Sequence, residues 1–483
     1  MKSKFYDKII LSIEDSIEKQ KQIRKELRIK NTGITEPLES EKFFSNYWPT
    51  TILENVVSVR GRIGFHGLTR IDYRDTGPIL LSVGNISNDG KLTFKNTTHI
   101  HDKAFKRSPN IIVEKNDILL SKSGTIGKVC LTEEIKEKLT INAAINIFRC
   151  GNLLLPKYLF YWFKSPATQA LLDKLAPGIA QRNLFQRELR RLSIPIPTLE
   201  FQNTLIIKIE ELFSKIDSTK QLLEHTKLQL EQYRQSLLKF AFEGKLTEEW
   251  REINKNRLEL IIPENKNYEI MDLHGWISCS IGDLIKLSKE KFEPLKGENK
   301  ILLGLEHIEK HTGRIIGQDN SKNTKSTKTV FRSGDVLYGR LRPYFNKITI
   351  PDFDGVCSTD ILVFQETTNI LNKFLKYFLM QGSFVKFTNQ NMTGVGLPRI
   401  SFGKISEFMI QLPSLMEQEQ IVSQIEQSFS LIENTSQIVE SSLQNLQTMK
   451  MSVLKQAFEG KLVLQDPNDE PASVLLERIK LKN

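Results

Sequence analysis

The stretch SLLKFAFEGKL at residues 236–246 returns as SVLKQAFEGKL at residues 452–462, with nine of eleven positions identical. The same shift along the chain, without a gap, places Gln202 on Gln418 and Gly178 on Gly394. A repeat of this length far exceeds the roughly 20 to 50 residues of a solenoid unit. The sequence therefore predicts two copies of one large module.

A long helix is predicted upstream of each copy of this tag. No Pro or Gly interrupts residues 203–242, and apolar residues recur at every seventh position. This seam consists of Ile209, Ile216, Leu223, Leu230 and Leu237 in the first copy and of Ile425, Ile432, Val439, Leu446 and Val453 in the second. A second, more polar seam follows three residues on, and the Gly of each tag ends the helix. We expect two equal helices in an antiparallel coiled coil, a rod of roughly 60 Å that holds two globular blocks apart.

The remainder of each copy predicts an α/β block. Short apolar runs bounded by turn residues, such as 78–82 and 360–364, are typical of strands. One helical stretch follows in each copy, at 156–172 and 371–387. The aromatic run YLFYWF at 158–163 is predicted to be core and not a base-stacking platform. The fold class is therefore α+β: two α/β blocks separated by two long helices in a pseudo-twofold tandem repeat.

Net charge varies between segments of the chain, which carries +11 in all. The predicted first block, residues 48–197, carries +10, and the second block, residues 273–413, carries +6. The central helical region, 198–272, has −3, the C-terminal helical region, 414–483, has −4, and a helical N-terminal extension, 1–47, has +2. Positive charge confined mainly to the two blocks is typical of surfaces that neutralise phosphates.

Composition excludes several classes of protein. The hydrophobic fraction is 39%, and no apolar run approaches the ~18 residues of a membrane span. The segment 1–30 mixes acids and bases and lacks the apolar core of a signal peptide, so we expect a cytoplasmic protein. The four cysteines are far apart in sequence and are predicted to be buried free thiols.

Catalytic signatures are missing from the sequence. Gly124 to Lys128 does not complete a phosphate-binding loop, because position 122 is Lys122 where that motif needs glycine. His307 and His311 have the spacing of one helical turn, but the polar residues and Gly313 around them indicate a loop. The sequence predicts neither an enzyme nor a metal site.

A family resemblance rests on several motifs together. They are the tag AFEGKL at the end of each predicted helix, the segment SKSGTIGK at 121–128, the segments GRLRPY at 339–344 and GVCSTD at 355–360, and the C-terminal run at 460–478. With them, nearly the whole chain resembles the DNA-specificity subunit of a type I restriction-modification system. The N-terminal extension departs from this pattern, with Ile9, Ile13, Ile17 and Leu27 at near-helical spacing. Whether it packs on the coiled coil or docks a partner stays open.

This resemblance implies a non-catalytic subunit that reads a bipartite double-stranded DNA target, one half-site per block. Its implied partners are two adenine methyltransferase subunits and the restriction subunits, which translocate and cut DNA. S-adenosylmethionine, ATP and Mg are expected on those partners. Phe242 and Phe458 in the two tags are candidate partner-binding residues.

Candidate DNA-binding residues cluster in each block. In the second block Arg340 and Arg342 share one face of a segment taken as extended, and Tyr344 joins them. Arginine forks match guanine O6 and N7, although salt-bridged surface arginines would explain the same pattern. In the first block we expect phosphate contacts from a glycine-containing turn, for which a purely structural turn is the alternative. Its candidates are Lys122, Ser123, Thr125 and Lys128. Arg182 and Arg399, near the aligned glycines, are candidates for backbone contacts.

Two other function classes remain open. A coiled-coil scaffold would explain the helices but not the positive charge between them. A solitary DNA-binding regulator would explain charge and duplication, yet no helix-turn-helix or zinc-finger spacing is present.

Overall fold

The structure is a computed structural model. It describes residues 18, 19, 22, 48–62, 68–176, 182–258, 269–271, 275–294 and 299–464. The apolar positions Ile9, Ile13, Ile17 and Leu27 lie outside these residues, as do 465–478 of the C-terminal run. The chain forms two compact units. The first unit comprises residues up to 224 together with residues from 440 onward, and the second unit comprises residues 225–439.

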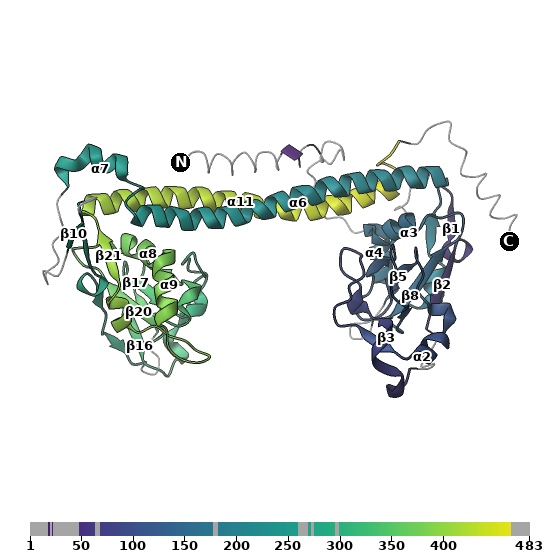
Figure 1. Ribbon diagram of the computed structural model, residues 1–483, viewed down its shortest axis with the longest axis horizontal. Coiled ribbons are helices and arrows are strands. Elements are labelled where there is room, and N and C mark those ends of the chain that lie inside the picture. Colours follow the sequence, from purple (N-terminus) through teal and green to yellow (C-terminus); the bar gives the residue numbers. More distant parts are fainter. Residues whose placement is uncertain are drawn as a thin grey trace. The chain divides into compact units, whose positions relative to one another are not determined.

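The two long helices are of equal length, as predicted. α6 (Leu199–Phe242) and α11 (Leu415–Phe458) each have 44 residues, and they are separated by the same shift as the two tags (Figure 1). All ten residues of the heptad seam are at most 4% exposed. In the first unit, Lys450 of α11 forms an ion pair of 2.6 Å with Asp217 of α6. In the second unit, Arg234 of α6 lies over the ring of Phe429 of α11 at 4.2 Å. Within each unit, half of α6 therefore packs antiparallel to half of α11, which confirms the predicted coiled coil.

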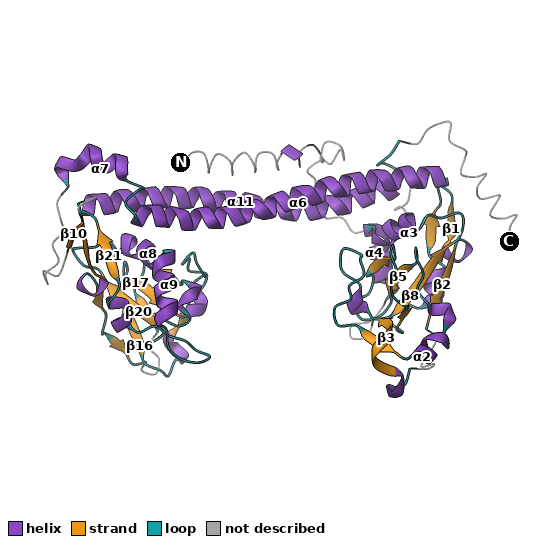
Figure 2. Cartoon of the chain, in the orientation of Figure 1, coloured by secondary structure: helices purple, strands orange, loops and turns teal. Residues whose placement is uncertain are grey.

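The first block is built from three small sheets with short helices around them (Figure 2). Its strand orders are β2-β8-β5-β6, β4-β3-β7 and β1-β9, and β3 and β7 pair in parallel. Its elements are β1 (Thr50–Ile52), β2 (Val57–Gly61), β3 (Tyr73–Leu81), β4 (Thr98–Ile100), α2 (Asp102–Lys106), β5 (Ile118–Ser121), β6 (Val129–Leu131), β7 (Leu139–Ile141), β8 (Ile145–Cys150), α3 (Pro156–Lys164), α4 (Pro166–Leu175), α5 (Gln186–Arg190) and β9 (Ser193–Pro195).

The second block repeats this architecture. Its strand orders are β12-β20-β17-β18, β13-β16-β19-β14-β15 and β10-β11-β21, and β14 and β19 pair in parallel. Its elements are β10 (Glu269–Met271), β11 (Trp276–Ser280), β12 (Lys286–Leu287), β13 (Lys291–Phe292), β14 (Ile301–Leu303), β15 (Asp319–Asn320), β16 (Lys328–Phe331), β17 (Val336–Gly339), β18 (Ile348–Thr349), β19 (Gly355–Cys357), β20 (Ile361–Gln365), α8 (Asn372–Met380), α9 (Gly382–Asn391), α10 (Phe402–Ser406) and β21 (Met409–Leu412). A short helix, α7 (Glu248–Asn254), follows α6.

The helical stretch predicted in each block is two helices, so that prediction was wrong in detail. α3 ends at Lys164 and α4 begins at Pro166, with Ser165 between them in an extended conformation. Proline fits the first turn of a helix but disfavours helical geometry in the residue before it. Ser165 also caps α4, because its Oγ accepts from the backbone N–H of Thr168. Gln381 occupies the same place between α8 and α9.

The aromatic run 158–163 is core, as predicted, since all six side chains are buried. Three of the four cysteines are buried and Cys150 is half-buried, and all four are free thiols. Burial raises the pKa of Cys130 to about 12.

A buried glutamine anchors the start of each long helix to its own block. Gln202 accepts from the backbone N–H of Leu155 at 2.9 Å and donates to the carbonyl of Pro197 at 2.9 Å. Gln418 makes the equivalent bonds to Leu371 and to the carbonyl of Pro413, at 2.9 and 3.0 Å. Both copies of the repeat thus contain the same hydrogen-bonded joint between helix and block.

The second unit contains a buried ionic cluster beside this joint. Glu417 has a side chain 1% exposed, and its Oε1 accepts from Thr247 Oγ1 at 2.7 Å and from Arg251 Nε at 2.8 Å. Its Oε2 accepts from the indole N–H of Trp276 at 2.9 Å. This cluster fastens α7 to the start of α11.

Candidate nucleic-acid interface

The first candidate cluster lies directly after β5. The backbone N–H of Lys122 donates to the carbonyl of Ala144 at 2.8 Å, and the carbonyl of Lys122 accepts from the N–H of Leu184 at 2.8 Å. Ser123 forms an isolated antiparallel bridge with Asn183. Lys122 and Ser123 are therefore fixed at the meeting point of three chain segments.

A tight turn follows this meeting point. Gly124 and Gly127 both have positive φ, 72° and 81°, which glycine adopts without steric cost. Ser121 Oγ closes the turn by donating to the carbonyl of Thr125 at 2.6 Å and accepting from the N–H of Lys128 at 2.8 Å. The predicted turn is present, and Thr125 is exposed at its tip.

The cations of this cluster differ in their partners. Lys128 Nζ donates to the carbonyl of Ile86 at 3.0 Å. Arg182 is held by Asp173, with 2.6 Å between Nη2 and Oδ1. Lys122 is in no ion pair within the described part of the chain, and partial burial lowers the pKa of its ammonium group. Of these three cations, Lys122 therefore has the side chain with the fewest contacts to polar groups of the protein.

The second candidate cluster lies directly after β17 and has the same backbone arrangement. The N–H of Arg340 donates to the carbonyl of Asp360 at 2.9 Å, and the carbonyl of Arg340 accepts from the N–H of Ile400 at 3.1 Å. Leu341 forms an isolated antiparallel bridge with Arg399. Each of these backbone hydrogen bonds and bridges in the first block thus has a counterpart in the second.

The two clusters occupy equivalent positions in the two blocks. Asn183 and Arg399 are related by the same shift as the two tags, and Lys122 and Arg340 by a shift only slightly larger. Their motifs, SKSGTIGK and GRLRPY, share almost no sequence. The fold therefore presents two different cationic loops from one kind of site.

The segment at Arg342 is not extended, so the predicted common face of its side chains was wrong. Arg342 has φ 50°, in the left-handed region, and Pro343 to Phe345 form a turn of 3-10 helix. Proline at the first helical position favours this turn. Tyr344 is 37% exposed, and its ring contacts Phe345 with centroids 4.8 Å apart.

The arginines of the second cluster also differ in whether an ion pair within the protein holds them. Arg399 forms a bidentate pair with Asp360, with distances of 2.7 and 3.1 Å. Arg342 donates its backbone N–H to the carbonyl of Pro398 and one guanidinium N–H to the carbonyl of Gly396. Across the described residues, neither Arg340 nor Arg342 is in an ion pair. The salt-bridge alternative thus describes Arg399 but not the two arginines of GRLRPY.

Sequence reasoning missed Asp360 as the anchor of this cluster. Asp360 supplies both the carbonyl that holds Arg340 and the carboxylate that holds Arg399. The repeat gives no sequence signal for this role, because the counterpart of Asp360 under the shift that relates the two tags is Ala144, which holds Lys122 by its carbonyl but has no carboxylate.

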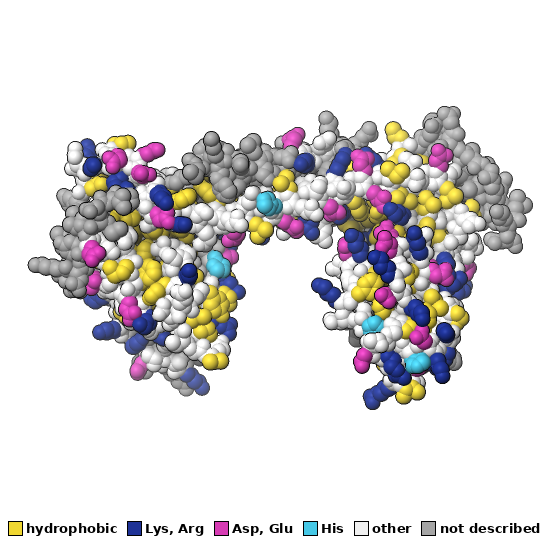
Figure 3. Space-filling model, viewed as in Figure 1, with side chains coloured by type: hydrophobic (Ala, Val, Ile, Leu, Met, Phe, Trp, Pro, Cys, Tyr) yellow, Lys and Arg dark blue, Asp and Glu magenta, His cyan; other side chains and the backbone are white. Residues whose placement is uncertain are grey.

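In the face shown in Figure 3, basic side chains project from the surface of both blocks, with acidic side chains among them. His307 ends a 3-10 helix, and His311 lies beyond it with φ 62°, so the two histidines do not lie on one helix.

The two tag phenylalanines are core residues of the units. Phe458 is 1% exposed and contacts the ring of Tyr158, with centroids 5.3 Å apart. Phe242 is 7% exposed and packs against Phe374 and Phe378 at 5.2 and 5.3 Å. The C-terminal end of each long helix thus packs on the block of the other repeat.

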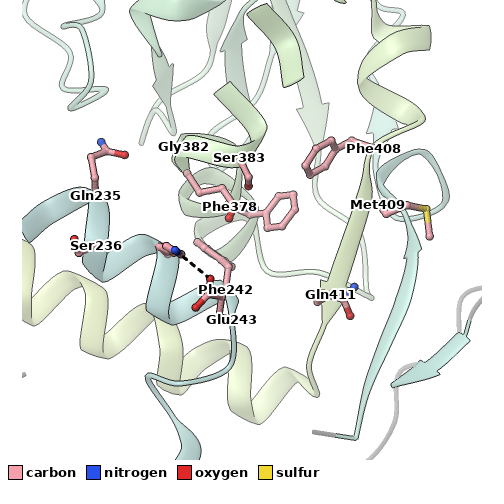
Figure 4. A pocket seen from close by; sticks show the side chains of 12 residues that line it. Gln235, Ser236, Phe242, Glu243, Phe378, Gly382, Ser383, Phe408, Met409 and Gln411 are labelled. Atoms are coloured by element: carbon pink, nitrogen blue, oxygen red, sulfur yellow. Dashed lines mark ion pairs between the residues drawn. The ribbon is translucent and has the colours of Figure 1, made fainter. Parts of the chain in front are cut away.

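A pocket of about 600 Å³ lies beside Phe242 in the second unit (Figure 4). Its walls come from the end of α6, the junction of α8 and α9, and β21. Phe378, Phe408 and the half-exposed Met409 give it an apolar floor.

None of the helices in the described part of the chain has the length and apolar character that a membrane span requires.

Fold and site together define a class of protein: a duplicated α/β module that presents one cationic loop per block and joins its blocks by paired helices. The family description "Type I restriction modification DNA specificity domain" matches residues 71–232 and 274–441, about two thirds of the chain. The chain belongs to this family.

Known proteins agree with this assignment. The chain is 25% identical over 461 residues to the type I restriction enzyme StySPI specificity subunit of Salmonella potsdam, which covers 90% of this chain and 95% of that protein. It is 29% identical over 305 residues to the EcoDI specificity subunit of Escherichia coli, covering 60% and 68%.

Solved structures share the fold. A chain from a structure on the assembly and conformational transition of the type I R-M system matches with a TM-score of 0.62 at 16% identity, covering 88% of this chain and all of that one. The HsdS subunit from Thermoanaerobacter tengcongensis matches with a TM-score of 0.50 at 15% identity, covering 86% and 98%.

Proposed function

We propose that this chain reads a bipartite DNA target, with one half-site per block, and that partner subunits perform the chemistry. The observation that carries this proposal is the equivalence of the two loops after β5 and β17. Lys122 and Arg340 occupy one structural position in two blocks, yet the sequences around them differ. A duplicated reader with two different loops suits a target whose halves differ in sequence.

The proposed roles follow from the partners of each cation. Arg340 and Arg342 have guanidinium donors available for base edges or phosphates, and an arginine fork suits guanine. Lys122 and the hydroxyls of Ser123 and Thr125 suit phosphate oxygens. Arg182 and Arg399 form ion pairs with aspartates, so we assign them mainly a structural role. Their contribution to contacts with the DNA sugar-phosphate backbone should be smaller.

The chemistry of the complex would reside on its partners. Methylation of adenine N6 requires the base to leave the stack and enter a methyltransferase active site, which this chain would support by positioning the duplex. S-adenosylmethionine, ATP and Mg would then bind to the methyltransferase and restriction subunits and not to this chain.

The pocket beside Phe242 is our candidate for part of the methyltransferase dock. Phe242 itself is a core residue, and truncating a buried Phe costs about 3 to 5 kcal/mol of folding free energy, so Phe242→Ala would confuse docking with stability. Met409→Glu is a sharper test, because Met409 is 53% exposed and lines the pocket. It should weaken complex assembly, and Met451→Glu, at a methionine of α11 that is 42% exposed, is the control. Unchanged assembly of the Met409→Glu protein would refute this part of the proposal.

The deciding experiment is co-expression with an adenine methyltransferase subunit, followed by single-molecule mapping of N6-methyladenine in host DNA. A bipartite motif with a constant gap, present only with this chain, is expected. Arg340→Ala should relax that motif in one half only, with a loss of about 1 to 3 kcal/mol in binding. The matched control is Arg332→Ala, an arginine of the same block paired with Glu290. A stable complex without any motif would overturn DNA reading by these blocks and favour the scaffold.

A further inference from the structure

A hairpin after α9 extends the second cationic cluster. Thr393 and Arg399 exchange two backbone hydrogen bonds, of 2.9 and 2.8 Å, and so close a short loop. Gly394 and Gly396 have positive φ, 107° and 82°, which lets the chain reverse at this loop. The base of the hairpin is further held by the pair between Arg399 and Asp360.

The tip of this hairpin is apolar and exposed. Val395 between the two glycines is fully exposed, and Leu397 is 51% exposed. Single apolar residues on a surface are common, but two on a loop with a fixed base form an apolar projection. Neither residue belongs to a hydrophobic cluster of the described structure.

Two arginines lie at the base of this projection. Arg342 binds the hairpin at two points, through its N–H to Pro398 and through Nη2 to the carbonyl of Gly396 at 3.2 Å. The Arg342 backbone there lies in the left-handed region, which is uncommon for a non-glycine residue. Arg340 lies on the adjoining segment. An apolar tip framed by arginines matches a ligand that is anionic outside and apolar within, which is the chemistry of a DNA groove.

We propose that Val395 and Leu397 are specificity-determining residues that contact thymine 5-methyl groups in the half-site read by the second block. This inference rests on the proposed function and adds a second kind of readout to it. The arginines would bind phosphates and acceptor edges, while the hairpin tip would distinguish thymine from cytosine by its methyl group. The corresponding segment of the first block, residues 177–181, lies outside the described residues.

Deoxyuridine tests this contact chemically, because it lacks only the methyl group of thymine. The probe is the duplex with the bipartite motif found by methylation mapping, with the thymines of each half-site replaced in turn. Binding of the complex with co-expressed methyltransferase is measured for the unaltered chain, for Val395→Ala, and for Ile253→Ala as control. Ile253 is 84% exposed on α7 of the same unit.

The expected result is non-additive. Loss of one buried methyl contact should weaken binding by about fourfold, either through Val395→Ala or through deoxyuridine in one half-site. The two changes together should cost little more than one of them, and deoxyuridine in the other half-site should not couple to Val395. Ile253→Ala should bind all probes like the unaltered chain.

Several outcomes would overturn the inference. If the unaltered complex binds the motif no better than a scrambled duplex, the proposed function fails and takes the inference with it. If the motif is bound specifically but neither Val395→Ala nor deoxyuridine changes affinity, only the inference fails. A Val395→Ala defect that is equal on every probe, or a loss of complex assembly, would also refute the methyl contact.

Discussion

Replacement of Glu417 should destabilise the second unit far more than replacement of any surface carboxylate. The carboxylate accepts from Thr247, Arg251 and Trp276 at 2.7 to 2.9 Å, and the Arg251 side chain is only 8% exposed. Glu417→Ala would leave this guanidinium buried without its counter-ion. Breaking one side of a buried pair typically costs about 3 to 5 kcal/mol. Arg251 keeps a 2.6 Å bond to the carbonyl of Gly244, so the lower end of this range, about 3 kcal/mol, is expected.

Glu210→Ala is the matched control for this prediction. Glu210 pairs with Lys157 at 2.6 Å, but its side chain is 40% exposed. Solvent-exposed pairs contribute about 0 to 1 kcal/mol. A double variant, Glu417→Ala with Arg251→Met, should recover at least about 2 kcal/mol relative to the sum of the single changes, because the unpaired charge is removed.

Denaturant unfolding read by pulsed hydrogen exchange measures each unit separately. This readout is needed because one global transition is not expected for two units. Glu417→Ala should lower the midpoint for peptides of the second unit and leave peptides of the first block unchanged. A loss no larger than that of Glu210→Ala, or a fully additive double variant, would show that the cluster does not hold the unit together.

Three further predictions follow from the same structure. Gln202→Ala and Gln418→Ala should each cost about 1 to 3 kcal/mol, because a partly buried backbone N–H loses its acceptor. Hydrogen exchange should locate each loss in the unit that carries the substitution. The four cysteine thiols should resist alkylation at pH 8 until the protein unfolds, since burial raises the pKa of each to about 12 and leaves about one in 10⁴ as thiolate; rapid native labelling would contradict this. Asp360→Asn should impair DNA binding although Asp360 itself is not expected to contact DNA, because the change releases Arg399 from the base of the hairpin. Normal DNA binding by this variant would refute that role.

The long helices were predictable because their determinants are local and periodic. A seam with period seven, the absence of Pro and Gly, and a terminal glycine define α6 and α11 closely. The buried glutamines were visible as well, since Gln202 and Gln418 align in the repeat. Such patterns need no knowledge of distant contacts.

The parts that escaped prediction depend on contacts between distant residues. Nothing near Arg342 signals its left-handed backbone, which Pro398 helps to hold from far along the chain. Glu417 has Phe201 as its counterpart in the first copy, so the repeat gave no sign of a buried carboxylate there. Whether an arginine is free or paired likewise depends on where a distant aspartate, such as Asp360 beside Arg399, lies in space.

The exchange of helix ends between the two repeats also fixes the order in which the units can be completed during synthesis. The second unit is one contiguous stretch, residues 225–439, whereas the first unit needs residues from 440 onward. Lys450 and Phe458, which complete the packing of the first unit, leave the ribosome after the whole of the second unit. The block translated first therefore waits, with part of its apolar surface uncovered, until the block translated second has all of its residues. Chaperones should be needed mainly during this interval. The interval should lengthen when translation pauses between 440 and 458.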